Sequence, residues 1–159
     1  MVVSSGGDKE RFYDTIADRF DEVVNRYDLE RRLEIVFDEM LASEVLAGRK
    51  LLDVGCGTGW FAKRAVSHGA HVTALDIGVR LLAKTREKCD ASLVAADACR
   101  LPFPDGAFDI VVSSECIEHT REPLRALAEM CRILKEGGSL VITVPNKFWR
   151  PSATFAAIF

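Results

Sequence analysis

Residues 51–60 hold the side chains and the spacing that are best suited to binding a ligand. The apolar start of this segment ends at Asp53, and Gly55, Gly57 and Gly59 follow it. Glycine accepts a positive φ and has no Cβ, so such a turn lets backbone N–H groups approach a ligand closely. A helix that begins at the turn adds the positive end of its dipole. The segment therefore predicts a site for a nucleotide-type cofactor.

The spacing of the glycines narrows the class of cofactor. A dinucleotide fingerprint reads G-x-G-x-x-G, whereas Trp60 stands where the third glycine belongs, and no P-loop pattern is present. Two further carboxylates, Asp76 and Asp97, each follow a later apolar run, and Asp76 lies 76 − 55 = 21 positions after Gly55. An acidic residue at about that distance accepts hydrogen bonds from ribose hydroxyls. For Asp76, a helix N-cap is the alternative.

These residues together resemble the class I S-adenosylmethionine-dependent methyltransferases, in particular the small-molecule branch of the ubiquinone/menaquinone-biosynthesis type. The resemblance extends over residues 50–146 and includes Leu-Pro-Phe-Pro-Asp at 101–105 and Glu-His at 118–119. It implies S-adenosyl-L-methionine as cofactor and S-adenosyl-L-homocysteine as product. It also implies an in-line displacement that carries a methyl group to a small-molecule acceptor.

The resemblance assigns cofactor roles to single residues. Asp76 is expected to bind the ribose, Ile77 one face of the adenine, and Asp97 and Ala98 its edge. Either Cys99 or Leu101 is expected to cover the second face. The implied cofactor-binding residues are Asp53, Gly55, Cys56, Gly57, Gly59, Asp76, Ile77, Asp97, Ala98, Ser114 and Tyr13. For Tyr13, ordinary helix packing is the alternative to contact with the cofactor.

His119 is the candidate catalytic base, because imidazole titrates near neutrality. A structural hydrogen bond at a helix start is the alternative role for this residue. For Glu115, contact with cofactor or substrate and a structural role are both open. We interpret Arg31 and Arg32 as a solvated charged face rather than as partners of the cofactor's carboxylate. The five cysteines form no C-x-x-C pair, so neither a metal site nor a disulfide is expected.

Hydrophobic periodicity predicts the elements that position these residues. Steps of three and four predict amphipathic helices over about 8–27 and 33–45. Strands are expected at 50–54, 71–76, 92–95, 108–114 and 139–144, with helices at 58–68, 79–89 and 123–134. This alternation predicts an α/β fold, namely a Rossmann-like, doubly wound, mostly parallel sheet with five recognisable strands and two extra N-terminal helices, in three αβα layers. In such a sheet ligands bind at the carboxyl ends of the strands, where the glycine turn falls.

We expect a single S-adenosylmethionine-binding domain over 1–159. It comprises an N-terminal helical lid (1–48), a Rossmann-like core (49–146) and an apolar tail (147–159) that is interpreted as a helix cut in mid-course. The fifth strand would then be an exposed sheet edge. Truncation, a strand-completing partner and a homodimer through that edge or the tail are the alternatives, of which we favour truncation.

Composition limits the classes of partner. The net charge is −3 and no basic run occurs, so nucleic acid is not an expected partner. No apolar stretch approaches the roughly 20 residues of a membrane-spanning helix, and the N-terminus lacks a signal core, so the expected location is the cytoplasm. Two other functions remain: a non-catalytic S-adenosylmethionine-binding module that needs a partner or further strands, and a nicotinamide-dependent oxidoreductase, which Trp60 disfavours.

Overall fold

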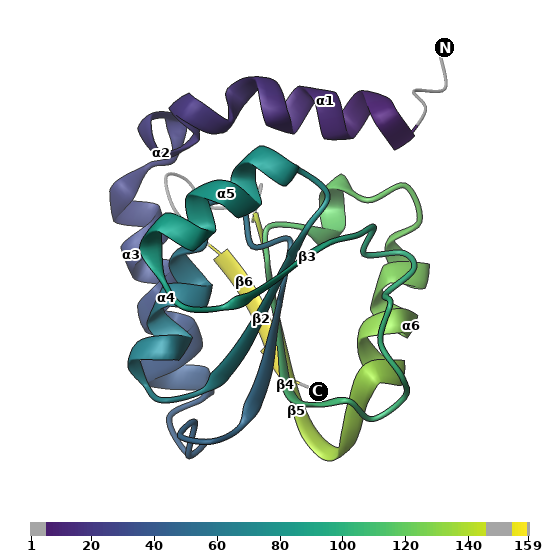
Figure 1. Ribbon diagram of the computed structural model, residues 1–159. Coiled ribbons are helices and arrows are strands. Elements are labelled where there is room, and N and C mark those ends of the chain that lie inside the picture. Colours follow the sequence, from purple (N-terminus) through teal and green to yellow (C-terminus); the bar gives the residue numbers. More distant parts are fainter. Residues whose placement is uncertain (1–5, 146–153, 159) are drawn as a thin grey trace.

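The computed structural model describes residues 6–145 and 154–158, with side chains for residues 11–22 and 24–145. A central sheet lies between helices on its two faces (Figure 1). The helical segments are α1 (Gly6–Ile16), a 3₁₀ turn (Ala17–Arg19), α2 (Phe20–Val23), α3 (Arg26–Glu34), a π-helix (Ile35–Met40), α4 (Trp60–Ser67), α5 (Val79–Lys88), a second 3₁₀ turn (Ile117–His119) and α6 (Pro123–Ile133). The strands are β1 (Lys50–Val54), β2 (His71–Asp76), β3 (Ser92–Ala95), β4 (Phe108–Ser114), β5 (Leu134–Pro145) and β6 (Thr154–Ile158).

The strand order is β3-β2-β1-β4-β5-β6, and β1 to β5 are parallel. The predicted Rossmann-like parallel sheet is therefore confirmed. β1 lies between β2 and β4, with Leu52 opposite Thr73 on one side and Val111 on the other. The chain moves outward from β1 to β3 and then returns to the far side of β1 with β4. This reversal makes the carboxyl ends of β1 and β4 the topological switch point, where doubly wound sheets bind ligands.

Two apolar cores hold the helices on the sheet. On one face, α3, the π-helix, α4 and α5 cover β1 and β2, with Val36, Phe61 and Leu82 among the buried residues. On the other face, α6 buries Met130 and Ile133 against β1, β4 and β5. The strands are apolar on both sides, as expected for a parallel sheet covered by helices on both faces. Both cores fix the strand ends that carry the glycine turn.

The predicted helix over 8–27 is interrupted. Val24 has extended backbone angles (φ −72°, ψ 123°), so the helical segment stops there. The Asn25 side chain then accepts hydrogen bonds from the backbone N–H groups of Tyr27 and Asp28 at 3.0 and 3.4 Å and caps α3. The second predicted helix becomes α3 followed by the π-helix. The N-terminal region is thus a chain of short helical pieces that can bend over the strand ends.

The prediction of a helix over the apolar tail is wrong for residues 154–158, which form β6. This strand runs antiparallel to β5, with Val141 opposite Ile158 and Pro145 opposite Thr154. β5 is therefore not an open sheet edge, and the predicted homodimer contact through that edge loses its basis. The remainder of the predicted tail helix lies outside the described residues. β5 also begins five residues earlier than predicted, at Leu134, because it first pairs with Phe108 before an irregularity in the register.

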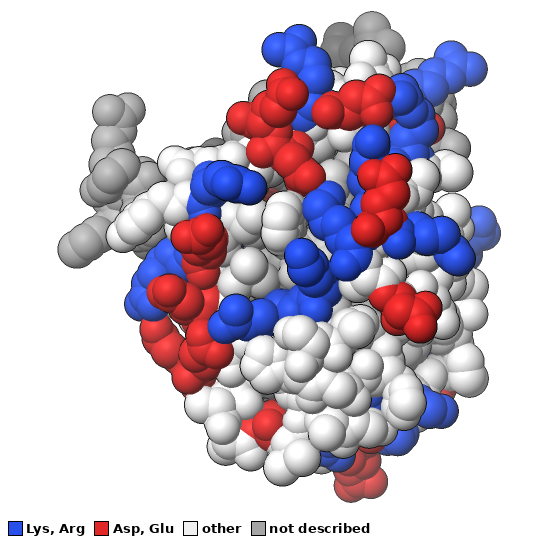
Figure 2. Space-filling model, turned by 60° about the vertical axis from the view of Figure 1, so that its left-hand side comes forward, with Lys and Arg blue, Asp and Glu red and all other residues white. Residues whose placement is uncertain are grey.

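Ion pairs join the N-terminal segments to the core. Asp38 pairs with Arg64 at 3.0 Å, and Lys88 pairs with Asp21 at 2.8 Å. The face that carries α3 and α4 accordingly shows acidic and basic side chains mixed together (Figure 2). Within the described ranges, no helix has the length and apolarity needed to cross a membrane.

Candidate functional site

The glycine turn lies between β1 and α4, and its three glycines all have positive φ: +74° at Gly55, +53° at Gly57 and +85° at Gly59. The N–H groups of Gly55 and Cys56 both donate to the carbonyl oxygen of Leu75, at 2.8 and 3.0 Å. The turn is thereby fastened to the end of β2. A chain with side chains at these positions would be strained in this conformation.

Each glycine also leaves space for a different neighbour. A Cβ on Gly55 would lie 2.5 Å from Cys116 Cβ, and one on Gly59 would lie 2.5 Å from Thr85 Cγ2. A Cβ on Gly57 would meet Phe20 Cε1 at 3.3 Å. Gly55 and Gly59 thus permit close packing of the β4 loop and of α5. Gly57 keeps open a space beneath Phe20.

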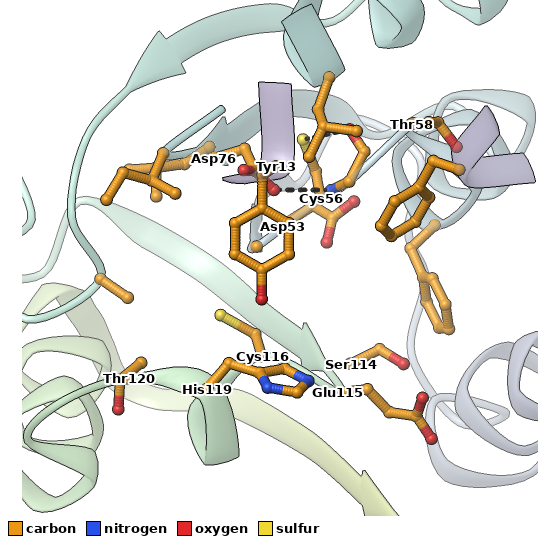
Figure 3. Close-up of a pocket in the computed structure, with 18 of the residues that line it drawn as sticks. Tyr13, Asp53, Cys56, Thr58, Asp76, Ser114, Glu115, Cys116, His119 and Thr120 are labelled. Carbon is orange, nitrogen blue, oxygen red and sulfur yellow. Dashed lines mark hydrogen bonds between the residues drawn. The ribbon is translucent and has the colours of Figure 1, made fainter. Parts of the chain in front are cut away.

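A cavity of about 370 Å³ opens above the turn, at the carboxyl ends of the strands. Figure 3 shows side chains from the glycine turn, the β4 end and α1 facing it. The predicted site residues that line it are Tyr13, Asp53, Gly55, Cys56, Gly57, Asp76, Ile77, Asp97, Ala98, Ser114 and His119. Gly59 does not line it, since it faces the buried Thr85. The structure therefore brings together eleven of the twelve predicted positions.

Asp53 lines the cavity with a buried carboxyl group whose pKa is raised. Its side chain is 1% exposed, and its Oδ2 atom has no hydrogen-bond partner among the described residues. Burial, together with the nearby charge of Asp76, raises the pKa of Asp53 to about 7. A cation in the cavity would stabilise the ionised carboxylate and lower that pKa. The site thus contains a buried acceptor that is suited to a positive ligand.

The Asp76 carboxylate links the glycine turn to the turn that precedes α5. Its Oδ2 accepts a hydrogen bond from Gly57 N at 2.8 Å, and its Oδ1 accepts one from Gly78 N at 2.9 Å, at the start of α5. Burial raises its pKa, while these backbone hydrogen bonds act in the opposite direction. Each carboxylate oxygen has two lone pairs, so both retain capacity for a ligand. The alternative role of Asp76 as a helix N-cap is wrong, because the N-cap of α5 is Gly78.

The segment after β3 differs in part from the prediction. Asp97 is exposed and lines the cavity, and its Oδ1 accepts a hydrogen bond from Cys99 N at 2.8 Å. Ala98 lines the cavity beside it. Cys99 and Leu101 are buried in the core under α6 and do not line the cavity. The expectation that one of these two covers an adenine face is wrong, because both are buried in that core cluster.

Arg32 is a lining residue that the sequence reasoning misjudged. It is 8% exposed, and its Nη1 donates to Ser114 Oγ at 3.0 Å and lies 3.5 Å from Glu115 Oε2. The interpretation as a solvated face holds for Arg31, which pairs with two surface glutamates, but is wrong for Arg32. The spacing of Leu29, Arg32 and Val36 by three and four places Arg32 on the apolar face of its helix, and this signal was available in the sequence.

The β4 end contributes Glu115 and His119. Glu115 has a φ of +51°, the one positive φ at a non-glycine position among the described residues. Such conformations are costly and cluster at functional sites. His119 lies in the 3₁₀ turn after β4, with its backbone N–H donated to Cys116 O at 2.9 Å and its ring beside Glu118. Its ring faces the cavity near Ser114 and Glu115 (Figure 3).

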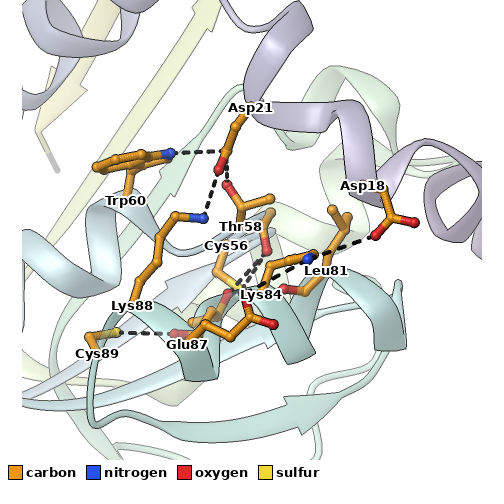
Figure 4. Close-up of polar contacts among 12 residues, drawn as sticks. Asp18, Asp21, Cys56, Thr58, Trp60, Leu81, Lys84, Glu87, Lys88 and Cys89 are labelled. Atoms are coloured by element: carbon orange, nitrogen blue, oxygen red, sulfur yellow. Dashed lines mark hydrogen bonds and ion pairs between the residues drawn. The ribbon is translucent and has the colours of Figure 1, made fainter.

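The N-terminal segment covers the cavity and is fastened by Asp21. Figure 4 shows the Asp21 carboxylate receiving contacts from Thr58, Trp60 and Lys88. Burial alone would raise the pKa of Asp21, but the hydrogen bonds from Lys88, Thr58 and Trp60 lower it. These contacts hold α2 against α4 and α5. Phe12, Tyr13 and Phe20 consequently lie over the cavity.

No group of three or more His, Cys, Asp or Glu side chains that could hold a metal ion occurs in the described part of the chain. The five cysteines are free thiols. Burial raises the pKa of Cys116 to about 12 and also raises that of Cys56 well above its usual value. These two thiols of the cavity are therefore protonated and act as small apolar surfaces.

Comparison with known proteins identifies the family that shares this fold. Residues 52–142 match the methyltransferase domain family. The chain is 36% identical over 140 residues to a demethylmenaquinone methyltransferase of Renibacterium salmoninarum, covering 81% of this chain and 58% of the relative. It is 32% identical over 131 residues to a malonyl-[acyl-carrier protein] O-methyltransferase of Erwinia billingiae, covering 80% of this chain and 52% of the relative.

A solved structure shares the fold. It is a putative methyltransferase in complex with the Trm112 methyltransferase activator of Haloferax volcanii, with a TM-score of 0.68 and 27% identity over 83% of this chain and 59% of that one. The chain spans between about half and three fifths of the length of these relatives. On the match of its central 91 residues (142 − 52 + 1) and on its identity to curated relatives, the chain belongs to the class I S-adenosylmethionine-dependent methyltransferase family.

Proposed function

We propose that this chain binds S-adenosylmethionine in the cavity and transfers its methyl group to a small-molecule acceptor. The observation that carries the proposal is the row of three carboxylates, Asp53, Asp76 and Asp97, at the ends of three neighbouring strands around a glycine turn with positive φ. Adenosine offers hydroxyl and amine donors to such acceptors. The family's cofactor therefore has a matching set of partners here.

The charge of the cavity supports a cationic ligand. Four acidic residues line it, Asp53, Asp76, Asp97 and Glu115, against two arginines. S-adenosylmethionine carries a sulfonium and an ammonium group, and the unpartnered oxygen of Asp53 is a buried acceptor for a cation. The space at Gly57, which a Cβ would restrict against Phe20, gives the methionyl chain room to approach the backbone. The unpartnered oxygen of Asp53 and the space at Gly57 therefore match the charge and the shape of the cofactor.

Several of the predicted residues that line the cavity then have a role in holding the cofactor. Asp76 accepts from the ribose hydroxyls while it keeps its bonds to Gly57 and Gly78, and Asp97 accepts from the adenine amine beside Ala98. Ile77 lies against the base. Ser114 and Tyr13 contact the cofactor from the β4 side and from α1.

The bound sulfonium supplies a methyl carbon that is open to displacement from the side opposite sulfur. The chain's contribution is to orient the acceptor, to exclude water and to take up a proton. Phe12, Tyr13 and Phe20 form the apolar cover that excludes water. With that methyl donor bound, His119 would accept the proton that a neutral acceptor hydroxyl loses on methylation. Orientation of two reactants alone supplies about 7–11 kcal/mol.

The test is calorimetric titration of the chain with S-adenosylmethionine, S-adenosylhomocysteine and NADH, with Gly57→Val as the matched variant. We expect the two adenosyl compounds to bind, NADH not to bind, and the variant to bind none of them while keeping its circular dichroism spectrum. Tight binding of NADH without binding of the adenosyl compounds would refute the proposal.

The second candidate is a cofactor-binding module without its own turnover. The chain spans 58% of a curated relative, so the turnover of that relative does not carry over to this chain without a test. A methyl-transfer assay across hydroxyl, amine and carbon acceptors separates the two, since the module would bind S-adenosylhomocysteine and yet transfer no methyl group. The Trm112-type activator seen with the solved neighbour is a further component for that assay.

A further inference from the structure

The connection between β3 and β4 contains the Leu-Pro-Phe-Pro-Asp motif at 101–105, to which the proposed function gives no role. The connection spans residues 96–107 and forms neither helix nor strand. It runs along α6, to which it is hydrogen-bonded (Figure 1). Backbone N–H and C=O groups that have no ladder or helix partner must find other partners. In this connection, side chains of α6 supply them.

Arg132, in the last turn of α6, uses every N–H donor of its guanidinium. Nη2 donates to Leu101 O at 3.1 Å, while Nη1 donates to Phe103 O at 2.9 Å and to Asp105 Oδ1 at 2.7 Å. Nε and Nη2 also donate to the two carboxylate oxygens of Glu129, at 2.8 and 2.9 Å. A guanidinium has five N–H donors, so these five hydrogen bonds use all of them. Arg132 therefore joins α6 to three residues of the motif.

Glu129 completes this clamp on the motif. Its Oε2 accepts a hydrogen bond from Leu101 N at 2.8 Å, so both backbone groups of Leu101 are bonded to the Arg132–Glu129 pair. Bidentate pairs of arginine and carboxylate are among the stronger hydrogen-bonded contacts. The hydrogen bonds from Arg132 also lower the pKa of Glu129, which keeps its carboxylate ionised near neutral pH. Since Pro102 and Pro104 each fix one φ angle, the clamped motif is stiff.

The clamp lies four residues after Asp97, which lines the cavity. The Asp97 side chain accepts a hydrogen bond from Cys99 N at 2.8 Å, and its carbonyl oxygen accepts one from Arg100 N at 2.9 Å. Both donors belong to the short stretch between Asp97 and Leu101. The direction of the Asp97 carboxylate therefore depends on where the clamp holds the far end of that stretch.

We propose that Arg132 is a positioning residue for base selectivity: with Glu129 it holds Asp97 where its carboxylate distinguishes a 6-amino purine from a 6-oxo purine. The inference rests on the proposed function, in which Asp97 accepts from the adenine amine. A 6-amino group donates to that carboxylate, whereas a 6-oxo group presents an acceptor to an acceptor. Only a carboxylate in a fixed place makes this distinction, because one that can turn away avoids the unfavourable contact.

The experiment measures, by calorimetry, the dissociation constants of S-adenosylhomocysteine and of its 6-oxo analogue, S-inosylhomocysteine. Wild type is compared with Arg132→Met and with Arg125→Met, the matched control, because Arg125 lies on the same helix and pairs with Glu122 at the surface. Arg132→Lys is the second variant, since it keeps the charge but has only three donors. Circular dichroism and thermal melting check that each variant is folded, and Arg132→Lys decides the outcome if Arg132→Met does not fold.

Wild type and Arg125→Met are expected to bind S-adenosylhomocysteine at least about 10-fold more tightly than the 6-oxo analogue, the factor for one hydrogen bond to a charged acceptor. In Arg132→Met this ratio of affinities is expected to fall toward 1, and in Arg132→Lys to fall by less. A general loss of stability would weaken both ligands equally and leave the ratio unchanged. In an Asp97→Ala background, Arg132→Met is expected to change the ratio no further, because the carboxylate through which it acts is gone.

A folded Arg132 variant with the wild-type ratio overturns the inference, and so does a further change of the ratio in the Asp97→Ala background. A wild type that binds both ligands equally overturns it too, while the proposed function stands. A wild type that binds neither ligand refutes the proposed function instead. Hydrogen exchange then decides the positioning role: faster exchange of the Cys99 amide in Arg132→Met than in Arg125→Met supports it, and equal rates overturn it.

Discussion

Replacement of Asp53 by Asn measures what the chain loses by keeping a carboxylate in the cavity lining. Asp53 is buried, its Oδ2 has no partner among the described residues, and burial raises its pKa from 3.8 to about 7. The folded chain therefore binds the Asp53 proton more tightly than the unfolded chain does. The stability that protonated Asp53 contributes is complete below the pKa of the unfolded chain, 3.8, and is lost as the pH rises through about 7. Asn has nearly the same shape and does not titrate.

The magnitude follows from that shift. Between about pH 5 and pH 8, the unfolding free energy of the wild type is expected to fall by roughly 2–3 kcal/mol relative to that of Asp53→Asn. Urea unfolding of both proteins at the two pH values gives the free energies. We expect the difference in unfolding free energy, variant minus wild type, to rise by that amount at the higher pH.

Asp109→Asn is the matched control. The hydrogen bonds from Lys135 and from Lys50 N lower the pKa of Asp109, so that carboxylate is ionised in both states over the whole range. Its difference from wild type is therefore expected to be flat with pH. A flat difference for Asp53→Asn as well would show that Asp53 does not titrate between these pH values in the folded chain, and the argument from its raised pKa would be refuted.

Three other changes test separate parts of the site. Gly55→Ala places a Cβ against Cys116 at a φ of +74° and is expected to lower the unfolding free energy by about 2–5 kcal/mol. Gly48 has a similar φ of +77° but open space around it, so Gly48→Ala is expected to lose only the cost of backbone strain, about 1–2 kcal/mol. Equal losses in urea unfolding would contradict the packing argument. Asp76→Asn is expected to weaken S-adenosylhomocysteine binding by about 1.5–3 kcal/mol in calorimetry, and unchanged affinity would exclude it as a ligand. Asp21→Asn is expected to speed proteolysis of residues 11–24 and the dissociation of S-adenosylhomocysteine in stopped flow, and unaltered rates would show that its contacts do not hold the cover.

The sheet was predictable because each inner strand is a short, nearly continuous apolar run between turn residues. The first four strands, at 50–54, 71–76, 92–95 and 108–114, have the predicted bounds. β1, β2 and β4 are buried on both faces, so composition alone marks them, whereas the edge strand β3 has no buried residue and is marked by the turn residues around it. The glycine turn was predictable for a related reason, since positive φ at alternate positions restricts the sequence to glycine.

The parts that were not predictable depend on contacts between distant residues. The burial of Arg32 depends on Ser114 and Glu115, which are more than 80 residues away in the chain. The strand at 154–158 forms because β5 offers an unpaired edge, and apolar periodicity does not distinguish such a segment from a helix. Cys99 and Leu101 turned out to lie in the core because α6 covers them, a contact that local sequence does not encode.

Trp60 gives the chain an optical signal of its own. Its indole Nε1 donates to Asp21 at 3.0 Å, and the ammonium groups of Lys63 and Lys88 lie 5.3 and 5.2 Å from its ring centroid. The charges around this fluorophore change whenever α2 leaves α4. Since the sequence has one other tryptophan, Trp149, the Trp149→Phe protein has a single emitter at the closure contact. Its emission spectrum therefore tests, without any attached dye, whether α2 leaves α4 when a ligand binds.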